Sequence, residues 1–262
     1  MGRLANLFSK KRSGILNVYC TAGFPQAEST LEVMQALQQN GADIIELGMP
    51  YSDPLADGEV IQASSAAALE NGMTIHKLFD QLRHFRDRID IPVILMGYMN
   101  PVLQFGFEDF CAQAAAVGID GLILPDLPMY EFETEYGSII KKYQLDMVFL
   151  VTPETSEARI RRLDELSSGF IYAVSSSSTT GNNKPLDEQQ DYLEKLKNMR
   201  LNNPVLVGFG IKDRASFRAA CQHTNGAIIG SAYIRELTKG EDIAETTARF
   251  LDNILAIDKN RY

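Results

Sequence analysis

Eight short apolar runs recur along the chain, and this repetition constrains the fold more than any other feature of the sequence. Each run is almost continuously apolar rather than alternating, which is typical of parallel strands that are buried on both faces. The runs are ILNVYCTAG (15–23), DIIELGMP (43–50), PVILMGY (92–98), DGLILPDL (120–127), DMVFLVT (146–152), FIYAVS (170–175), PVLVGFG (204–210) and GAIIGSA (226–232).

Amphipathic segments with helical periodicity separate these runs. Asp213 stands where the N-cap of one such helix is expected, and a closing helix over 242–257 is expected to turn Ala244, Ala248, Leu251 and Leu255 inward. Strand and helix alternate eight times within 262 residues, without a low-complexity linker. This organisation predicts a single (β/α)8 TIM barrel over residues 1–262, with an open doubly wound sheet as the alternative.

Two segments fall outside the repeating pattern. Residues 1–14 are expected to form an N-terminal helix that covers the bottom of the barrel. The polar segment SSSSTTGNNKP begins at residue 175, and residues 175–186 are expected to form a mobile lid or, alternatively, a plain solvated loop.

Charge and cysteine usage exclude several classes of protein. The formal net charge is −9 and the basic residues are scattered, which argues against nucleic acid or an anionic membrane as a partner. The three cysteines show no CxxC spacing, and the N-terminus has no secretory pattern. We therefore expect reduced thiols and a cytoplasmic location.

Two carboxylates lie where a barrel of this kind places its active site. Glu46 is at the end of the second run and Asp57 is in the loop that follows, and barrel active sites form at the C-terminal ends of the strands. Burial among apolar residues should raise the pKa of Glu46 and let it both give and take a proton. Asp57, in a more solvated loop, should stay ionised and hold a substrate N–H or O–H. The alternative is structural: Glu46 pairs with a buried partner, and Asp57 shapes a turn.

Glycines at the ends of the last two runs suggest a phosphate site. Gly208 and Gly210 end the seventh run, and Gly230 and Ser231 lie where the eighth passes into a helical segment. Barrels frequently bind phosphate in the loops after strands 7 and 8, where backbone N–H groups can approach an anion closely. Tight turns that need glycine are the alternative.

Other catalytic strategies lack the residues they need. None of the eight runs contains the lysine of a Schiff-base enzyme, and His76, His84 and His223 fall on expected helices, where we predict surface positions. We therefore expect no metal and no cofactor. The remaining chemistry is proton transfer on a small phosphorylated substrate.

ELGMPYSDPLADG (46–58) resembles the signature of the tryptophan synthase alpha chain family. Further matching motifs follow in order along nearly the whole chain: YCTAGFP (19–25), YMNPVLQFG (98–106), LPDLP (124–128), TPETS (152–156), GFGIKD (208–213) and IIGSA (228–232). The resemblance implies a (β/α)8 barrel that splits indole-3-glycerol phosphate into indole and glyceraldehyde 3-phosphate.

The resemblance also assigns roles. Glu46 would protonate the ring carbon and take a proton from the adjacent hydroxyl, and Asp57 would accept a hydrogen bond from the indole N–H. The positions that it implies for substrate binding are Tyr19, Tyr172 and Phe209 at the indole, Gly210, Gly230 and Ser231 at the phosphate, and Thr180 and Gly181 in the lid. Ser176 and Ser178 depart from the arginine and glycine that many members carry in the lid.

The family works with a beta chain that carries pyridoxal phosphate, in an alpha2beta2 assembly. By resemblance, the loop with Asp53 and Pro54 and the loop with Asn100 and Pro101 are expected to contact that partner. Two alternatives remain: a sugar-phosphate epimerase or isomerase, which would share the glycines but not the motif around Asp57, and a non-catalytic homologue that only activates its partner.

Overall fold

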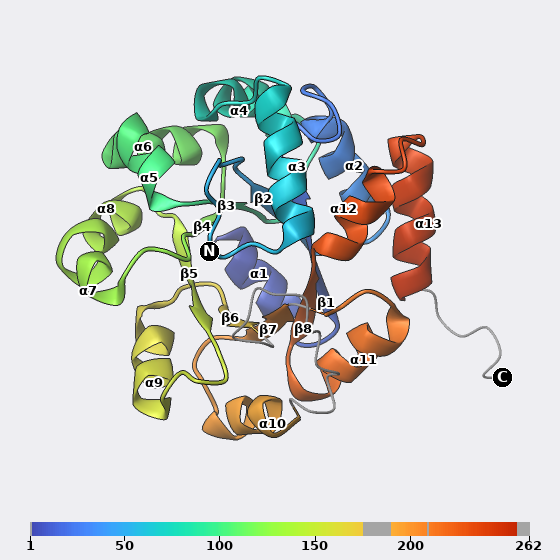
Figure 1. The fold of residues 1–262 in the computed structure, drawn as a ribbon. Helices are drawn as coiled ribbons and strands as arrows, with labels where there is room; N and C mark the ends of the chain where they lie inside the picture. The colour runs from blue at the N-terminus through green and yellow to red at the C-terminus, as the bar shows by residue number, and fades with distance from the viewer. Residues whose placement is uncertain (1, 175–189, 209, 256–262) are drawn as a thin grey trace, which may run out of the picture.

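Eight parallel strands close into a barrel in the order β1 to β8, surrounded by helices, in a computed structural model that describes residues 2–174, 190–208 and 210–255 (Figure 1). The predicted TIM barrel is confirmed, and each apolar run supplies one strand. The strands are β1 Ile15–Thr21, β2 Ile44–Gly48, β3 Val93–Met96, β4 Gly121–Ile123, β5 Asp146–Val151, β6 Ile171–Val174, β7 Val205–Gly208 and β8 Gly226–Ile229.

Helices accompany the strands: in Figure 1, α2 to α13 lie around the barrel, whereas α1 lies near the centre of the view. They are α1 Arg3–Lys10, α2 Thr30–Gln39, α3 Glu59–Glu70, α4 Ile75–Gln81, α5 Met99–Phe105, α6 Phe107–Val117, α7 Met129–Glu131, α8 Gly137–Lys142, α9 Glu157–Leu166, α10 Gln190–Met199, α11 Arg214–His223, α12 Ser231–Leu237 and α13 Ile243–Leu255, with a 3-10 turn at Leu82–Asp87 and a π turn at Phe132–Tyr136.

Each strand buries side chains on both faces, in two separate apolar clusters. One cluster fills the barrel interior, and its strand residues include Ile15, Ile44, Ile94 and Ile228. The other lies between the strands and the helices. Because strand side chains alternate between faces, Glu46 points to the same interior as Ile44, two residues earlier.

The first helix contributes to the interior cluster. Leu4 is completely buried and belongs to the same cluster as Ile15 and Phe170, which lie at the N-terminal ends of β1 and β6. The ring of Phe8 lies 6.2 Å from that of Phe170.

Two expectations about helices had different outcomes. Asp213 caps α11 as predicted, and its Oδ1 accepts the N–H of Ser216 at 2.8 Å. The predicted inward face of α13 was wrong at Ala244, which is exposed, whereas Thr247 is fully buried. Thr247 can be buried because its hydroxyl donates to the carbonyl of Ile243 and bonds the hydroxyl of Tyr233, both at 2.7 Å.

Candidate active site

Glu46 lies on the interior face of β2, in the middle of the strand rather than at its end. It pairs in register with Tyr19 on β1 and Ile94 on β3, and only 1% of it is exposed. The side-chain amide of Asn17 donates a hydrogen bond to its Oε2 at 2.9 Å. The carboxyl group is therefore buried and fixed by one neutral donor.

These surroundings raise the pKa of Glu46 to about 8. Burial is the main cause, because a charged carboxylate loses its hydration inside the barrel. The hydrogen bond from Asn17 lowers the pKa, and the nearby charge of Asp57 raises it. A carboxyl with this pKa holds a proton at neutral pH and can still release it, as the sequence led us to expect.

Asp57 follows β2 in a loop and is held from two sides. Its backbone N–H donates to the carbonyl of Pro54 at 3.1 Å, and its carbonyl accepts the side-chain amide of Gln62 at 2.8 Å. The hydroxyl of Tyr98 donates to its carboxylate. The same hydroxyl accepts the N–H of Ala56 at 3.1 Å, so Tyr98 fixes both the loop and the acid.

The expectation that Asp57 is well solvated was wrong. Only 9% of the residue is exposed, and burial raises the pKa of its carboxyl to about 6, although the hydrogen bond from Tyr98 lowers it. Burial nevertheless raises the pKa of Glu46 further than that of Asp57, so the two acids differ in how readily they ionise.

Two tyrosines reach over glycines of the adjacent strands. A Cβ on Gly48 would lie 2.1 Å from the hydroxyl of Tyr19, and a Cβ on Gly208 would lie 2.4 Å from the hydroxyl of Tyr172. Both rings are buried. Only glycine leaves room for them at these strand ends.

The charges of both acids influence both tyrosines. Burial is the main cause that raises the pKa of Tyr19 and of Tyr172, and the charges of Asp57 and Glu46 add to it in each case. The pKa of Tyr172 is also raised by Tyr19. Side chains from β1, β2, β6 and the loop after β2 therefore converge at one end of the barrel.

The expected phosphate-binding glycines lie at that same end. Gly210 follows β7 with φ +79°, and a Cβ there would have no atom within 4 Å. Gly230 is the N-cap of α12, whose first residue is Ser231, and a Cβ on Gly230 would lie 3.4 Å from the Cβ of Tyr19. The predicted lid 175–186, with Thr180 and Gly181, and also Phe209, lie outside the described residues.

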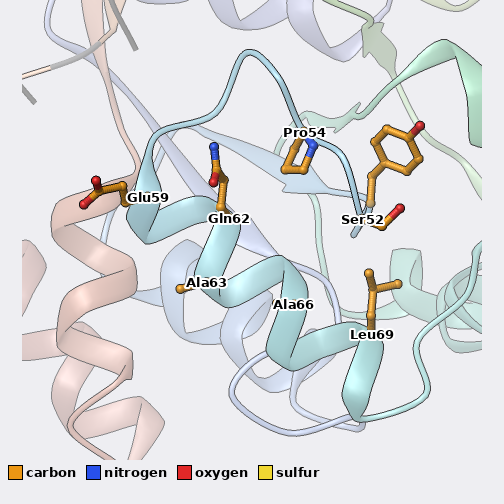
Figure 2. Close-up of a pocket in the computed structure, with 8 residues that line it drawn as sticks. Ser52, Pro54, Glu59, Gln62, Ala63, Ala66 and Leu69 are labelled. Atoms are coloured by element: carbon orange, nitrogen blue, oxygen red, sulfur yellow. The ribbon is translucent and has the colours of Figure 1, made fainter. Parts of the chain in front are cut away.

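A separate hollow lies on the outer side of the loop after β2. Figure 2 shows it between this loop, at Ser52 and Pro54, and α3, where Gln62 and Leu69 are among its walls. Its volume is about 540 Å³. Neither Glu46 nor Asp57 lines it, so the hollow is separate from the end of the interior at which the two acids lie.

The described parts of the chain contain no group of three or more His, Cys, Asp or Glu placed to hold a metal ion. His76 and His84 are exposed as expected, whereas His223 is partly buried. Within the same residues, no helix has the length and apolar character that a membrane crossing requires.

Comparisons with known proteins identify the family. The family profile described as "Tryptophan synthase alpha chain" matches residues 4–259. The chain belongs to the tryptophan synthase alpha chain family. It is 48% identical over 253 residues to the tryptophan synthase alpha chain of Parabacteroides distasonis, covering 96% of this chain and 98% of that one. The alpha chain of Flavobacterium johnsoniae is 51% identical over 226 residues, covering 86% and 89%.

Solved structures of the same family have the same fold. The alpha subunit of Legionella pneumophila matches with a TM-score of 0.87 at 32% identity, covering 97% of both chains. Tryptophan synthase from M. tuberculosis in an aminoacrylate-bound form matches with a TM-score of 0.84 at 30% identity, covering 97% of this chain and 100% of that one. The resemblance inferred from the motifs is thus confirmed, and with it the lyase activity of the family.

Two residues at the site were not found by sequence reasoning. Asn17 is a polar residue inside an otherwise apolar strand, a signal that was visible in the sequence. Tyr98 lies two residues after the end of β3, in the region from which barrels draw functional side chains.

Proposed function

We propose that the chain cleaves indole-3-glycerol phosphate to indole and glyceraldehyde 3-phosphate in L-tryptophan biosynthesis, with Glu46 and Asp57 as its catalytic residues. One observation carries this assignment: two buried carboxyls at one end of the barrel have pKa values of about 8 and about 6. The Glu46 carboxyl therefore keeps its proton up to a higher pH than the Asp57 carboxyl does. One acid can therefore donate a proton while the other accepts a hydrogen bond.

The reaction balances with these two groups alone. Glu46 gives its proton to ring carbon C3, and Asp57 stabilises the resulting positive charge by accepting the indole N–H. The Glu46 carboxylate then takes the proton of the side-chain hydroxyl, whose carbon becomes the aldehyde as the bond to C3 breaks. The bonding electrons return to the ring, and Glu46 ends in its starting state.

Binding is assigned to the neighbouring residues. Tyr19, Tyr172 and Phe209 would contact the indole. The backbone at Gly210 and Gly230, with Ser231, would bind the phosphate, supported by the open space at Gly210 and the helix start after Gly230. The lid residues Thr180 and Gly181 complete this assignment.

We also propose a beta chain as partner, in an alpha2beta2 assembly in which pyridoxal phosphate belongs to the partner and this chain needs no cofactor. A solved tryptophan synthase complex from Pyrococcus furiosus matches with a TM-score of 0.85 at 34% identity, covering 94% of this chain and 100% of that one. Three large apolar residues among those described are exposed: Leu55 (87% exposed), Leu103 (47%) and Tyr130 (72%). They lie in the segments that follow β2, β3 and β4, and they support a docking face there. The loops with Asp53 and Pro54 and with Asn100 and Pro101 belong to this face.

We place the protein in the cytoplasm. All three cysteines are free thiols, which suits a reducing compartment.

The test is release of indole from indole-3-glycerol phosphate by the purified chain, with and without an equimolar beta chain. Indole release by the chain alone, increased by the beta chain, is the expected result. Stimulation of the beta chain without any indole release would instead indicate a non-catalytic homologue, and turnover of sugar phosphates only would indicate an epimerase or isomerase.

A further inference from the structure

Asn17 is a buried amide in the apolar interior of the barrel. It lies on β1, is 0% exposed, and pairs in register with Ile44 on β2 and Ile228 on β8. A primary amide among isoleucines costs stability unless its polar atoms are hydrogen-bonded. An apolar side chain at this position would therefore suit the core better.

Among the residues that the structure describes, only one half of this amide has a partner. Its Nδ2 donates to Oε2 of Glu46 at 2.9 Å, whereas its Oδ1 is buried and accepts no hydrogen bond from any described residue. A residue that serves only the core would be expected to satisfy both atoms. The hydrogen bond to Glu46 is therefore the contribution that distinguishes asparagine from an apolar residue at position 17.

The other ionisable groups around Glu46 do not favour its charged form. Those coupled to it among the described residues are Asp57 in the loop after β2, Tyr19 and Cys20 on β1, and Tyr172 on β6. All are acids, and the facing residue on β3 is the apolar Ile94. Burial and the charge of Asp57 raise the pKa of Glu46, and the hydrogen bond from Asn17 lowers it.

We propose that Asn17 is the positioning residue of the proton shuttle, which holds the carboxyl of Glu46 in place and stabilises it when it is ionised. This inference rests on the proposed function, in which Glu46 is briefly ionised after it protonates the ring carbon. Without the Asn17 donor, that carboxylate would be charged in an apolar interior and would lack this hydrogen bond. An amide also carries an acceptor, so a turn of the side chain would let the free Oδ1 accept the proton of the neutral carboxyl.

The first experiment compares the pH dependence of kcat for indole release in the wild type, Asn17→Leu and Asn17→Asp. Leucine has nearly the shape of asparagine but no donor, so the fall of kcat at high pH should move upward by about one pH unit, with KM unchanged within about twofold. Aspartate adds a negative charge in the same shape and should move the midpoint further still. A folded Asn17→Leu enzyme with the wild-type midpoint would overturn the proposal.

Thr247→Val is the matched control. It removes two buried hydrogen bonds of α13, to Ile243 and to Tyr233, far along the chain from Glu46, and keeps the side-chain shape. It should lower stability and leave the midpoint of the pH profile unchanged. A shift as large as that of Asn17→Leu would mean that any loss of a buried hydrogen bond moves the profile, and would sink the inference.

A second measurement needs neither activity nor a folded Asn17 variant. The side-chain NH2 resonances of Asn17 in the wild-type protein should titrate together with the carboxyl of Glu46, and should lose this dependence in Glu46→Gln. Resonances that stay constant while Glu46 titrates would refute the link. Absence of indole release with an intact titration would instead refute the proposed function and leave the Asn17–Glu46 pairing standing.

Discussion

Replacing Glu46 by glutamine should abolish turnover and, at alkaline pH, should make the fold more stable. Glutamine keeps the shape of the side chain and cannot ionise. In the wild type, burial raises the pKa of this carboxyl from 4.5 to about 8. At 1.36 kcal/mol per pKa unit, the difference corresponds to about 5 kcal/mol, an upper limit because water that enters the site on ionisation would reduce it.

The sign follows from which state releases the proton first. Between pH 4.5 and pH 8 the unfolded chain has lost the proton of Glu46 while the folded chain retains it. The contribution of the neutral Glu46 carboxyl to the free energy of unfolding is therefore complete below pH 4.5, declines between pH 4.5 and pH 8, and is lost above pH 8. Glu46→Gln has no such decline, so its advantage over the wild type should grow across the same interval.

The assay is urea unfolding followed by circular dichroism at several pH values between 5 and 9, for the wild type, Glu46→Gln and Glu70→Gln. Glu70 is an exposed glutamate on α3, so its variant should follow the wild-type curve. Curves for Glu46→Gln and the wild type that run parallel over the whole range would refute the reasoning, because they would mean that Glu46 ionises in the folded state as easily as in the unfolded one.

Four further changes test separate parts of the structure. Asp57→Asn removes the charge that we propose accepts the indole N–H, and steady-state indole release should fall by at least about 100-fold. Tyr98→Phe removes the donor that lowers the pKa of Asp57, so the acidic limb of the pH–rate profile should move to higher pH; an unchanged limb would contradict the assigned contact. Gly48→Ala would place a methyl group 2.1 Å from the hydroxyl of Tyr19 and should raise KM sharply, as measured by substrate titration. We propose that α1 covers the bottom of the barrel, and Leu4→Ala should then lower the free energy of unfolding by about 3 kcal/mol in urea, with kcat at the active end preserved.

Much of the architecture could be predicted because it depends on local patterns. A short, continuously apolar run is typical of a parallel strand that is buried on both faces. Eight such runs separated by helices therefore favour a closed barrel of parallel strands. Glu46 could be placed in the barrel interior for the same reason, since it stands within one of those runs, but it lies in the middle of β2 and not at its end as expected.

The misplaced features depend on contacts between distant segments. The burial of Asp57 follows from Tyr98, which comes from the loop after the next strand, and no local pattern reveals that the two meet. The inward face of α13 was misjudged because a threonine reads as polar, whereas Thr247 satisfies its hydroxyl within its own helix and against Tyr233. In both cases a tertiary hydrogen bond changed where a polar side chain could lie.

The paired tyrosines and glycines limit how this end of the barrel could be re-engineered for other ring systems. A shorter side chain at Tyr19 or Tyr172 would free space at this end of the interior. A side chain added at Gly48 or Gly208 would instead collide with the ring of Tyr19 or Tyr172 and displace it. A variant library intended to accept larger aromatic substrates should therefore vary Tyr19 and Tyr172 and keep Gly48 and Gly208 unchanged.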